Sequence, residues 1–107
     1  MKPRPGPMRA TATALLLAAL ASGCFGPPQM GPDREAFKTI DALYTAVSLH
    51  EPVQVDRCVE SLSKLRDAGK LPAPAHDTLA AIIAEAKGGR WEPAQARLRD
   101  FMLAQRR

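Results

Sequence analysis

The sequence has few of the residues from which common active sites are built. It contains two cysteines and two histidines in 107 residues. No CxxC, HExxH or CxxCH motif occurs, so neither a clustered zinc site nor haem attachment is expected. Gly88-Gly89 precedes a predicted helix but lacks the remaining residues of a phosphate-binding loop. We therefore predict no catalytic residue, no metal site and no cofactor.

Aromatic residues and distributed positive charge are also scarce. One Trp, one Tyr and three Phe offer few platforms for stacking on bases. The formal net charge is +4, but three basic residues lie within the first nine positions, and the remainder of the chain balances 12 bases against 11 acids. A chain without a global basic field has little attraction for phosphate backbones, so we expect no nucleic-acid partner.

No hydrophobic run reaches the length of about 20 residues that a bilayer-spanning helix needs. The longest candidate, Ala10 to Ala21, is an uncharged stretch of Ala, Leu and Thr. Lys2, Arg4 and Arg9 precede it, and the small residues Ser22 and Gly23 follow it. A basic start, a short apolar stretch and a small-residue cleavage site are typical of a secretory signal peptide.

The segment Leu20-Ala21-Ser22-Gly23-Cys24 resembles the lipobox of bacterial lipoproteins, although Ala21 stands where Leu is commonest. The resemblance implies that residues 1–23 are removed between Gly23 and Cys24. It also implies that the Cys24 thiol receives diacylglycerol, with further acylation of the new amino group, so that lipid holds the mature chain on a membrane. By analogy with enterobacterial sorting, Phe25 in place of Asp favours the periplasmic face of the outer membrane.

Residues 25–32, FGPPQMGP, contain three prolines and two glycines, a composition typical of an extended spacer. We expect residues 24–32 to form a lipidated flexible tether and residues 33–107 to form one domain of roughly 75 residues. A core of that size has little stability to spare, so self-association is an open alternative.

Apolar residues recur at helical spacing throughout the domain and predict four helices and no strand. The first runs from about Asp33 to Leu49, and the second from Pro52 to near Gly69. The third starts near Pro74 or Ala75 and stops at Gly88-Gly89, and Trp91 opens the fourth. The predicted inner positions are Phe37, Ile40, Tyr44, Val47, Val55, Cys58, Val59, Leu62, Leu65, Leu79, Ile82, Ile83, Ala86, Ala94, Leu98, Phe101 and Met102.

A register shift of 39 residues superimposes the apolar positions of the first two helices on those of the last two, for example Ile40 on Leu79 and Leu62 on Phe101. The chain is therefore predicted to be all-α and built from two helical hairpins. Such hairpins pack as a compact bundle or stack as a short solenoid. Residues 79–103, LAAIIAEAKGGRWEPAQARLRDFML, resemble a tetratricopeptide hairpin, in which a Gly-aromatic step joins two helices rich in small residues.

Two features of the domain are candidates for function. Cys58 lacks an intramolecular partner once Cys24 is lipidated, and it is interpreted as a small buried hydrophobe, with a redox or metal thiol as the alternative. Residues 87–107 hold six bases and two acids. These bases are candidates for contact with an anionic surface or an acidic partner, or for a solvated polar face: Lys87, Arg90, Arg97, Arg99, Arg106 and Arg107.

Other polar and aromatic residues are interpreted structurally. His50 and His76 lie at predicted helix boundaries, where a solvated or capping histidine is common. Trp91 is expected to hold the third and fourth helices together. The sequence therefore predicts a non-enzymatic envelope lipoprotein, an interaction or structural module whose partner is an unknown envelope protein or a second copy. The alternative is a protein that handles a small ligand or metal through Cys58 or a pocket between the hairpins.

Overall fold

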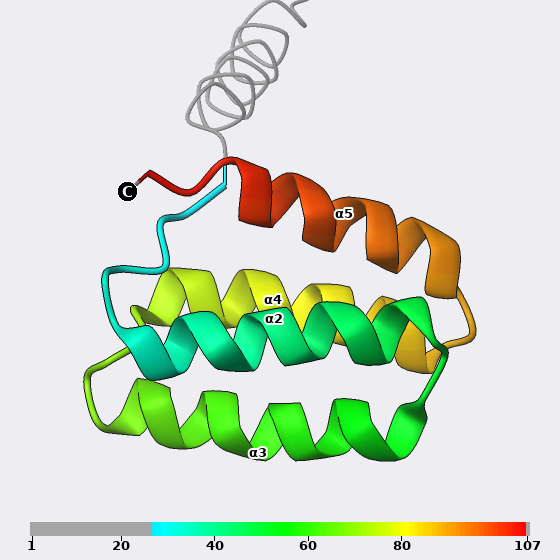
Figure 1. Cartoon of the computed structure of the whole chain (residues 1–107), viewed down its shortest axis with the longest axis horizontal. Coiled ribbons are helices and arrows are strands. Elements are labelled where there is room, and N and C mark those ends of the chain that lie inside the picture. The colour runs from blue at the N-terminus through cyan, green and yellow to red at the C-terminus, as the bar shows by residue number, and fades with distance from the viewer. Residues whose placement is uncertain (1–26, 107) are drawn as a thin grey trace, which may run out of the picture.

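The computed structural model describes residues 27–106, in which four helices follow one another along the chain. They are α2 (Arg34–Ser48), α3 (Pro52–Asp67), α4 (Ala73–Lys87) and α5 (Trp91–Leu103), as Figure 1 shows. No strand occurs in this part of the chain. The prediction of an all-α fold is confirmed, and each helix boundary lies close to the position expected from the sequence.

The helix starts follow from local side-chain chemistry. Asp33 caps α2, because its carboxylate accepts a hydrogen bond of 3.0 Å from the Ala36 amide, and Glu35 lies in the first turn. Pro52 is the first residue of α3, a position where its missing N–H removes no hydrogen bond. Pro72 directly precedes α4, so the proline-rich stretch that interrupts one helix also begins the next.

Three helices end in the same way, on a residue with left-handed backbone. At the end of α2, the His50 amide donates to the Val47 carbonyl (3.2 Å) and the Glu51 amide donates to Ala46 (2.9 Å). The equivalent pair of bonds closes α3 at Gly69 and α4 at Gly89. This is the Schellman arrangement, which requires positive φ. Glycine adopts it freely at Gly69 (φ 76°) and Gly89 (φ 91°), whereas His50 (φ 55°) must tolerate it with a side chain.

The helix boundaries repeat with the period found in the sequence. Both ends of α4 lie 39 residues after the corresponding ends of α2, and α5 begins 39 residues after α3. The two left-handed residues His50 and Gly89 are separated by the same interval. The prediction of two helical hairpins is therefore confirmed at the level of backbone geometry.

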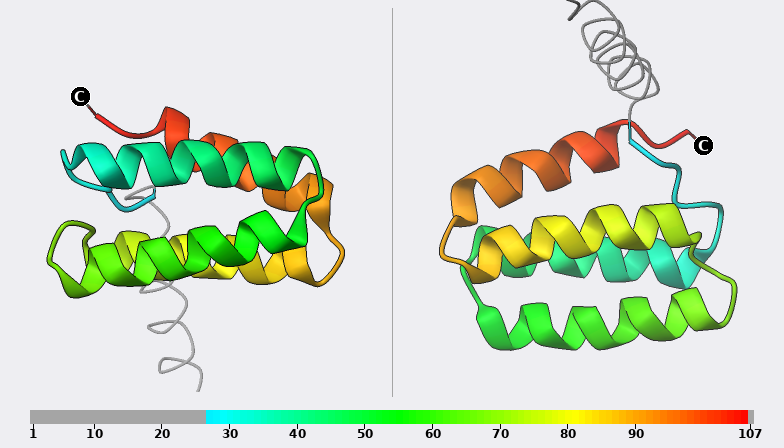
Figure 2. Two further views of the ribbon diagram at one scale, coloured as in Figure 1. Left: turned by 60° about the horizontal axis from the view of Figure 1, so that its bottom comes forward. Right: turned by 180° about the vertical axis from the view of Figure 1, so that it is seen from behind.

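The two hairpins pack face to face as an antiparallel bundle (Figure 2). Within the hairpins α2 packs on α3 and α4 on α5, and between them α2 packs on α5 and α3 on α4. Contact between the first and last helices closes the ring around one core, so the arrangement is a bundle and not an open solenoid. The described core consists of Met30, Ala36, Ile40, Leu43, Ala46, Val47, Val55, Cys58, Leu62, Leu71, Ala75, Leu79, Ile82, Ile83, Ala86, Ala94, Leu98 and Phe101.

The inner face of α2 differs slightly from the one expected. Phe37 is 38% exposed and lies at the edge of the core, whereas Ala36 and Leu43 are fully buried. The apolar spacing of three and four residues fits two neighbouring faces of this helix, and packing against α3 and α5 selects the one centred on Ala36 and Leu43. None of the helices described here is long and apolar enough to cross a bilayer.

Candidate functional site

The segment that precedes the first helix packs on the bundle. Cys24 and Gly23, the expected lipidation and cleavage residues, lie outside the described residues. Residues 27–32 are described, and they differ from a free spacer: Met30 is 3% exposed and belongs to the core. Pro27 and Pro28 lie over α4 and α5, against Ile82 and Phe101. Met30, inside the segment predicted to be a flexible tether, is therefore part of the folded domain.

Two glutamines fasten this segment to the end of α5. Gln29 donates through Nε2 to the Ala104 carbonyl (3.0 Å) and accepts through Oε1 from the Arg106 amide (2.8 Å). Gln105 reciprocates, since its Oε1 accepts from the Met30 amide (2.7 Å) and its Nε2 donates to the Pro28 carbonyl (3.2 Å). We call this arrangement of Gln29 and Gln105 the glutamine clamp.

The glutamine clamp also completes the end of α5. This helix ends at Ala104 without a glycine, so its last carbonyls need other partners. Gln105 Nε2 donates to Phe101 O (2.8 Å), and Gln29 supplies the donor for Ala104. Sequence reasoning missed this feature; the one available signal was Met30, an apolar residue inside a Pro/Gly stretch.

The six basic residues near the carboxyl end do not form one patch. Three of them are paired with acids: Arg97 and Arg90 both contact Glu85, at 2.9 and 3.7 Å, and Lys87 contacts Asp56 of α3. These pairs link the polar edges of α4 to α5 and α3. The basic side chains and Asp56 are substantially exposed, whereas Glu85 is largely shielded, so the Lys87–Asp56 pair contributes little to stability.

Arg99 and Arg106 are placed differently. Arg99 lies beside Tyr44 and Gln95 along the seam between α2 and α5, and Arg106 is exposed just after the helix ends. Neither is in an ion pair within the described part of the chain. Arg107 lies outside the described residues.

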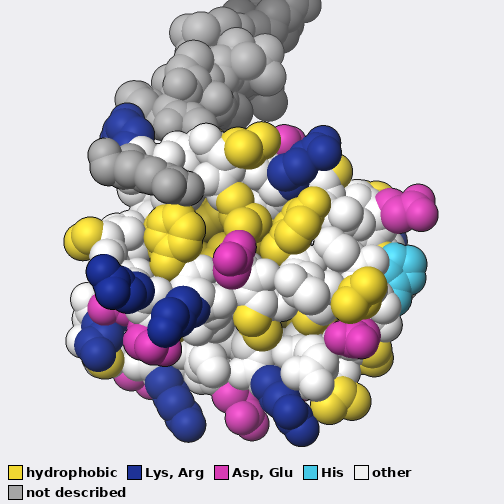
Figure 3. Space-filling view, viewed as in Figure 1, with side chains coloured by type: hydrophobic (Ala, Val, Ile, Leu, Met, Phe, Trp, Pro, Cys, Tyr) yellow, Lys and Arg dark blue, Asp and Glu magenta, His cyan; other side chains and the backbone are white. Residues whose placement is uncertain are grey.

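Exposed apolar side chains gather at two places. Leu49 (61%) and Val53 (63%) lie at the turn between α2 and α3. Leu103, 76% exposed, lies at the opposite end of the bundle on α5. Beside it, a hollow of about 280 Å³ runs along the seam between α2 and α5 and is lined by Met30, Phe37, Ile40, Asp41, Met102, Leu103 and Gln105. Figure 3 shows apolar side chains along this seam.

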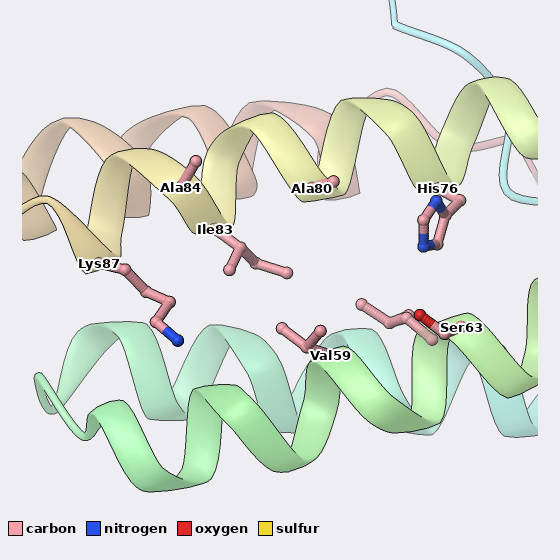
Figure 4. Close-up of a pocket in the computed structure, with 8 residues that line it drawn as sticks. Val59, Ser63, His76, Ala80, Ile83, Ala84 and Lys87 are labelled. Atoms are coloured by element: carbon pink, nitrogen blue, oxygen red, sulfur yellow. The ribbon is translucent and has the colours of Figure 1, made fainter.

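A second hollow lies between the hairpins, as the alternative hypothesis required. It has a volume of about 320 Å³ and lies between α3 and α4 (Figure 4). Its floor is apolar, formed by Val59, Leu62, Ala80, Ile83 and Ala84. Polar groups lie at its two ends, with Lys87 at one end and His76 and Ser63 at the other. An apolar hollow with polar groups at its ends suits a ligand with a hydrocarbon body and a polar head.

Cys58 does not contribute to the hollow between the hairpins. It is buried at 8% exposure on the side of α3 that faces α2, next to Thr39 and Ala42. It is a free thiol, and desolvation by burial raises its pKa above the ordinary value. A protonated, enclosed thiol is a poor nucleophile and a poor metal ligand. The interpretation of Cys58 as a small core residue is supported by its position.

The two histidines have structural neighbours. The His50 ring stacks on Trp91, with centroids 5.0 Å apart and planes inclined by 11°. Trp91 thus joins the α2–α3 turn to the start of α5, and it also packs against the core. His76 lies between Asp77 (3.4 Å) and Arg66 (3.5 Å). No group of three or more His, Cys, Asp or Glu suited to a metal ion occurs among residues 27–106.

No family model matches the chain, and neither the curated proteins nor the solved structures contain a match.

Proposed function

We propose that this chain is a bacterial lipoprotein, attached to a membrane through lipid on Cys24, whose helical bundle is a non-enzymatic interaction module of the cell envelope. The observation that carries the proposal is the order of segments. A signal-like start, a lipobox-like Gly23-Cys24 and a folded bundle follow one another, with only residues 25 and 26 between the cysteine and the part of the chain that packs on the domain.

The placement of reactive side chains supports a non-enzymatic role. Cys58 is enclosed and held as a thiol, His50 stacks on Trp91, and Glu85 is shared between two arginines. These groups are occupied in holding the bundle together. The partner in this proposal is an envelope protein or a second copy of the chain, and Phe25 after the lipobox cysteine favours the periplasmic face of the outer membrane.

Cell fractionation tests the attachment. The wild-type chain is expected in the membrane fraction, and Cys24→Ser is expected to lose that association. Cys58→Ser is the matched control, because it removes the other cysteine without touching the lipobox. Membrane association that survives Cys24→Ser would contradict the proposal.

Affinity purification from detergent-solubilised membranes tests the interaction role. We expect a stoichiometric envelope partner or a self-oligomer that is still recovered with Cys58→Ser. Repeated recovery of a monomer alone would count against an interaction module.

The hollow between α3 and α4 favours a second candidate function, the carriage of a small amphipathic anion. Its apolar floor suits the hydrocarbon chain of a fatty acid better than a polar metabolite, and Lys87, which contacts Asp56, lies at one end. Native mass spectrometry of protein from its own host should then show a bound mass that Ala84→Trp, which fills the hollow, removes. Protein that is free of ligand when isolated, and that takes up no fatty acid on addition, would exclude this function.

A further inference from the structure

We infer that the outer face of α5 around Leu103 lies against the bilayer, with Arg99 and Arg106 beside it among anionic phospholipid headgroups. This inference rests on the proposed lipid attachment at Cys24. It adds the surface that meets the membrane and the orientation of the bundle.

The reach of the chain is the first argument. Pro28 lies four positions after Cys24, and an extended chain of that length spans at most about 14 Å. The Pro28 carbonyl accepts a hydrogen bond from Gln105, two residues beyond Leu103, the last residue of α5. A lipid on Cys24 therefore holds the carboxyl end of α5 close to the bilayer surface, and the glutamine clamp prevents the bundle from moving away on a longer spacer.

The chemistry of this surface is the second argument. Leu103 is the most exposed of the large hydrophobic side chains described. Arg99 precedes it by four residues on the same side of the helix, and Arg106 follows it by three. Arginine lays its aliphatic stem along apolar surface while its guanidinium contacts phosphate, so arginines beside an exposed leucine suit a headgroup region.

Three acids lie near this surface. Asp41 of α2 lines the same hollow as Leu103, Glu92 lines a hollow with Arg99, and Asp100 follows Arg99 on α5. The other bases of this region, Arg90, Arg97 and Lys87, are engaged with Glu85 and Asp56. Within residues 87–106, Arg99 and Arg106 are therefore the two bases without an ion pair, and both lie toward the end of α5 that the anchor holds.

The other exposed apolar site provides an internal control. Leu49 and Val53 lie at the α2–α3 turn, at the opposite end of the bundle from the carboxyl end of α5 (Figure 1). Val53 is nearly as exposed as Leu103, at 63% against 76%. The two positions thus differ in distance from the anchor more than in burial.

The test uses the full chain, processed in its host and reconstituted into vesicles of phosphatidylethanolamine and phosphatidylglycerol. An environment-sensitive fluorophore is attached at Leu103→Cys or, as control, at Val53→Cys, both combined with Cys58→Ala. We expect blue-shifted emission at position 103, with quenching by nitroxide-labelled lipid at least threefold stronger than at position 53.

The other possible results of this test would each overturn the proposed orientation. Equal, water-like emission at both positions in protein that floats with the vesicles would overturn the orientation and leave the lipid anchor intact. Shielding at position 103 without lipid quenching would show that a second copy or a partner covers this face, which also overturns the inference. A chain without acyl groups that fails to float removes the proposed function together with the orientation.

Reversal of the charge at Arg99 and Arg106 tests whether these arginines contact lipid headgroups or only lie near the bilayer. Arg99→Glu combined with Arg106→Glu is expected to at least halve the quenching at position 103 in anionic vesicles, and to change it little in vesicles of phosphatidylcholine alone. Arg57→Glu with Lys64→Glu, two exposed bases on α3, is the matched control and is expected to have no effect. Equal loss of quenching in the two pairs would contradict a role for the arginines of α5.

Discussion

The two hairpins share one register and differ at their ends. In the first hairpin, α3 ends at Gly69 and its last carbonyls are satisfied by the following amides. In the second, α5 ends without a glycine, and the glutamine clamp supplies donors for Phe101 and Ala104. The repeated part of the chain builds the core. The glutamine clamp, which has no counterpart in the first hairpin, joins the bundle to the segment that contains Gln29.

The largest expected effect comes from the shared core. Leu62 and Phe101 are equivalent under the 39-residue repeat, and both are almost fully buried. Large-to-small substitutions at such sites remove transfer free energy and leave a cavity, so we expect losses in the free energy of unfolding of about 3 kcal/mol for Leu62→Ala and about 4 kcal/mol for Phe101→Ala.

Urea denaturation followed by circular dichroism measures these losses, and hydrogen exchange shows where they fall. Because α2 packs on α5, each substitution should destabilise both hairpins together. Unfolding of only the substituted hairpin would contradict the conclusion that the two hairpins share one core.

The glutamine clamp should give the next largest effect. Gln105→Ala removes three hydrogen bonds and leaves the Met30 amide and two carbonyls without their donors or acceptors, so the free energy of unfolding should fall by about 2 kcal/mol. Gln95→Ala, which removes one long bond of 3.4 Å to Tyr44, is the control and should cost below about 0.5 kcal/mol. Limited proteolysis near residues 27–32 should accelerate in Gln105→Ala alone. Equal proteolysis rates would argue that the clamp does not hold the segment.

Substitutions at the left-handed residues of the two turns, His50 and Gly89, should change the free energy of unfolding by smaller amounts. Gly89→Ala places a Cβ at φ 91° and should cost about 1–2 kcal/mol, because only glycine adopts this conformation without strain. His50→Gly relieves the same strain but loses the stacking on Trp91, worth about 1 kcal/mol, so its net effect should lie within about 0.5 kcal/mol of zero.

Thermal unfolding of His50→Gly, His50→Ala and Gly89→Ala distinguishes the two contributions. His50→Ala keeps the backbone strain at positive φ and loses the stacking on Trp91. It should therefore be less stable than His50→Gly. The reverse order would show that strain at His50 is negligible.

The smallest effect concerns pH. Burial raises the pKa of the Cys58 thiol, so the folded state favours the protonated form. The stability that this provides is present below the thiol's ordinary pKa and is lost as the pH rises through the raised value. The wild-type chain should lose slightly more stability than Cys58→Ala between neutral pH and strongly alkaline pH. Parallel curves for the two proteins would contradict the assignment of Cys58 to a desolvated core position.

Much of the fold follows from local signals in the sequence. Apolar spacing, Pro52, Gly69 and Gly88-Gly89 place all four helices, and the 39-residue shift pairs them into hairpins. These signals act within one or two helical turns. Closure of α2 on α5, and hence the choice of a bundle over a solenoid, depends on contacts between distant residues that periodicity does not encode.

The candidate site was less predictable for the same reason. The clamp joins Gln29 to residues 75 and 77 positions later, and no local pattern marks either glutamine as a partner. The six bases near the carboxyl end looked equivalent in sequence. Only the packing of α4 against α5 and α3 separates the ion-paired Lys87, Arg90 and Arg97 from Arg99 and Arg106.

Intact-mass analysis of the chain purified from its native membranes tests the central claim most directly. The account predicts a polypeptide that begins at Cys24 and carries the added mass of two or three acyl chains. An unmodified polypeptide that begins at Met1 would contradict it.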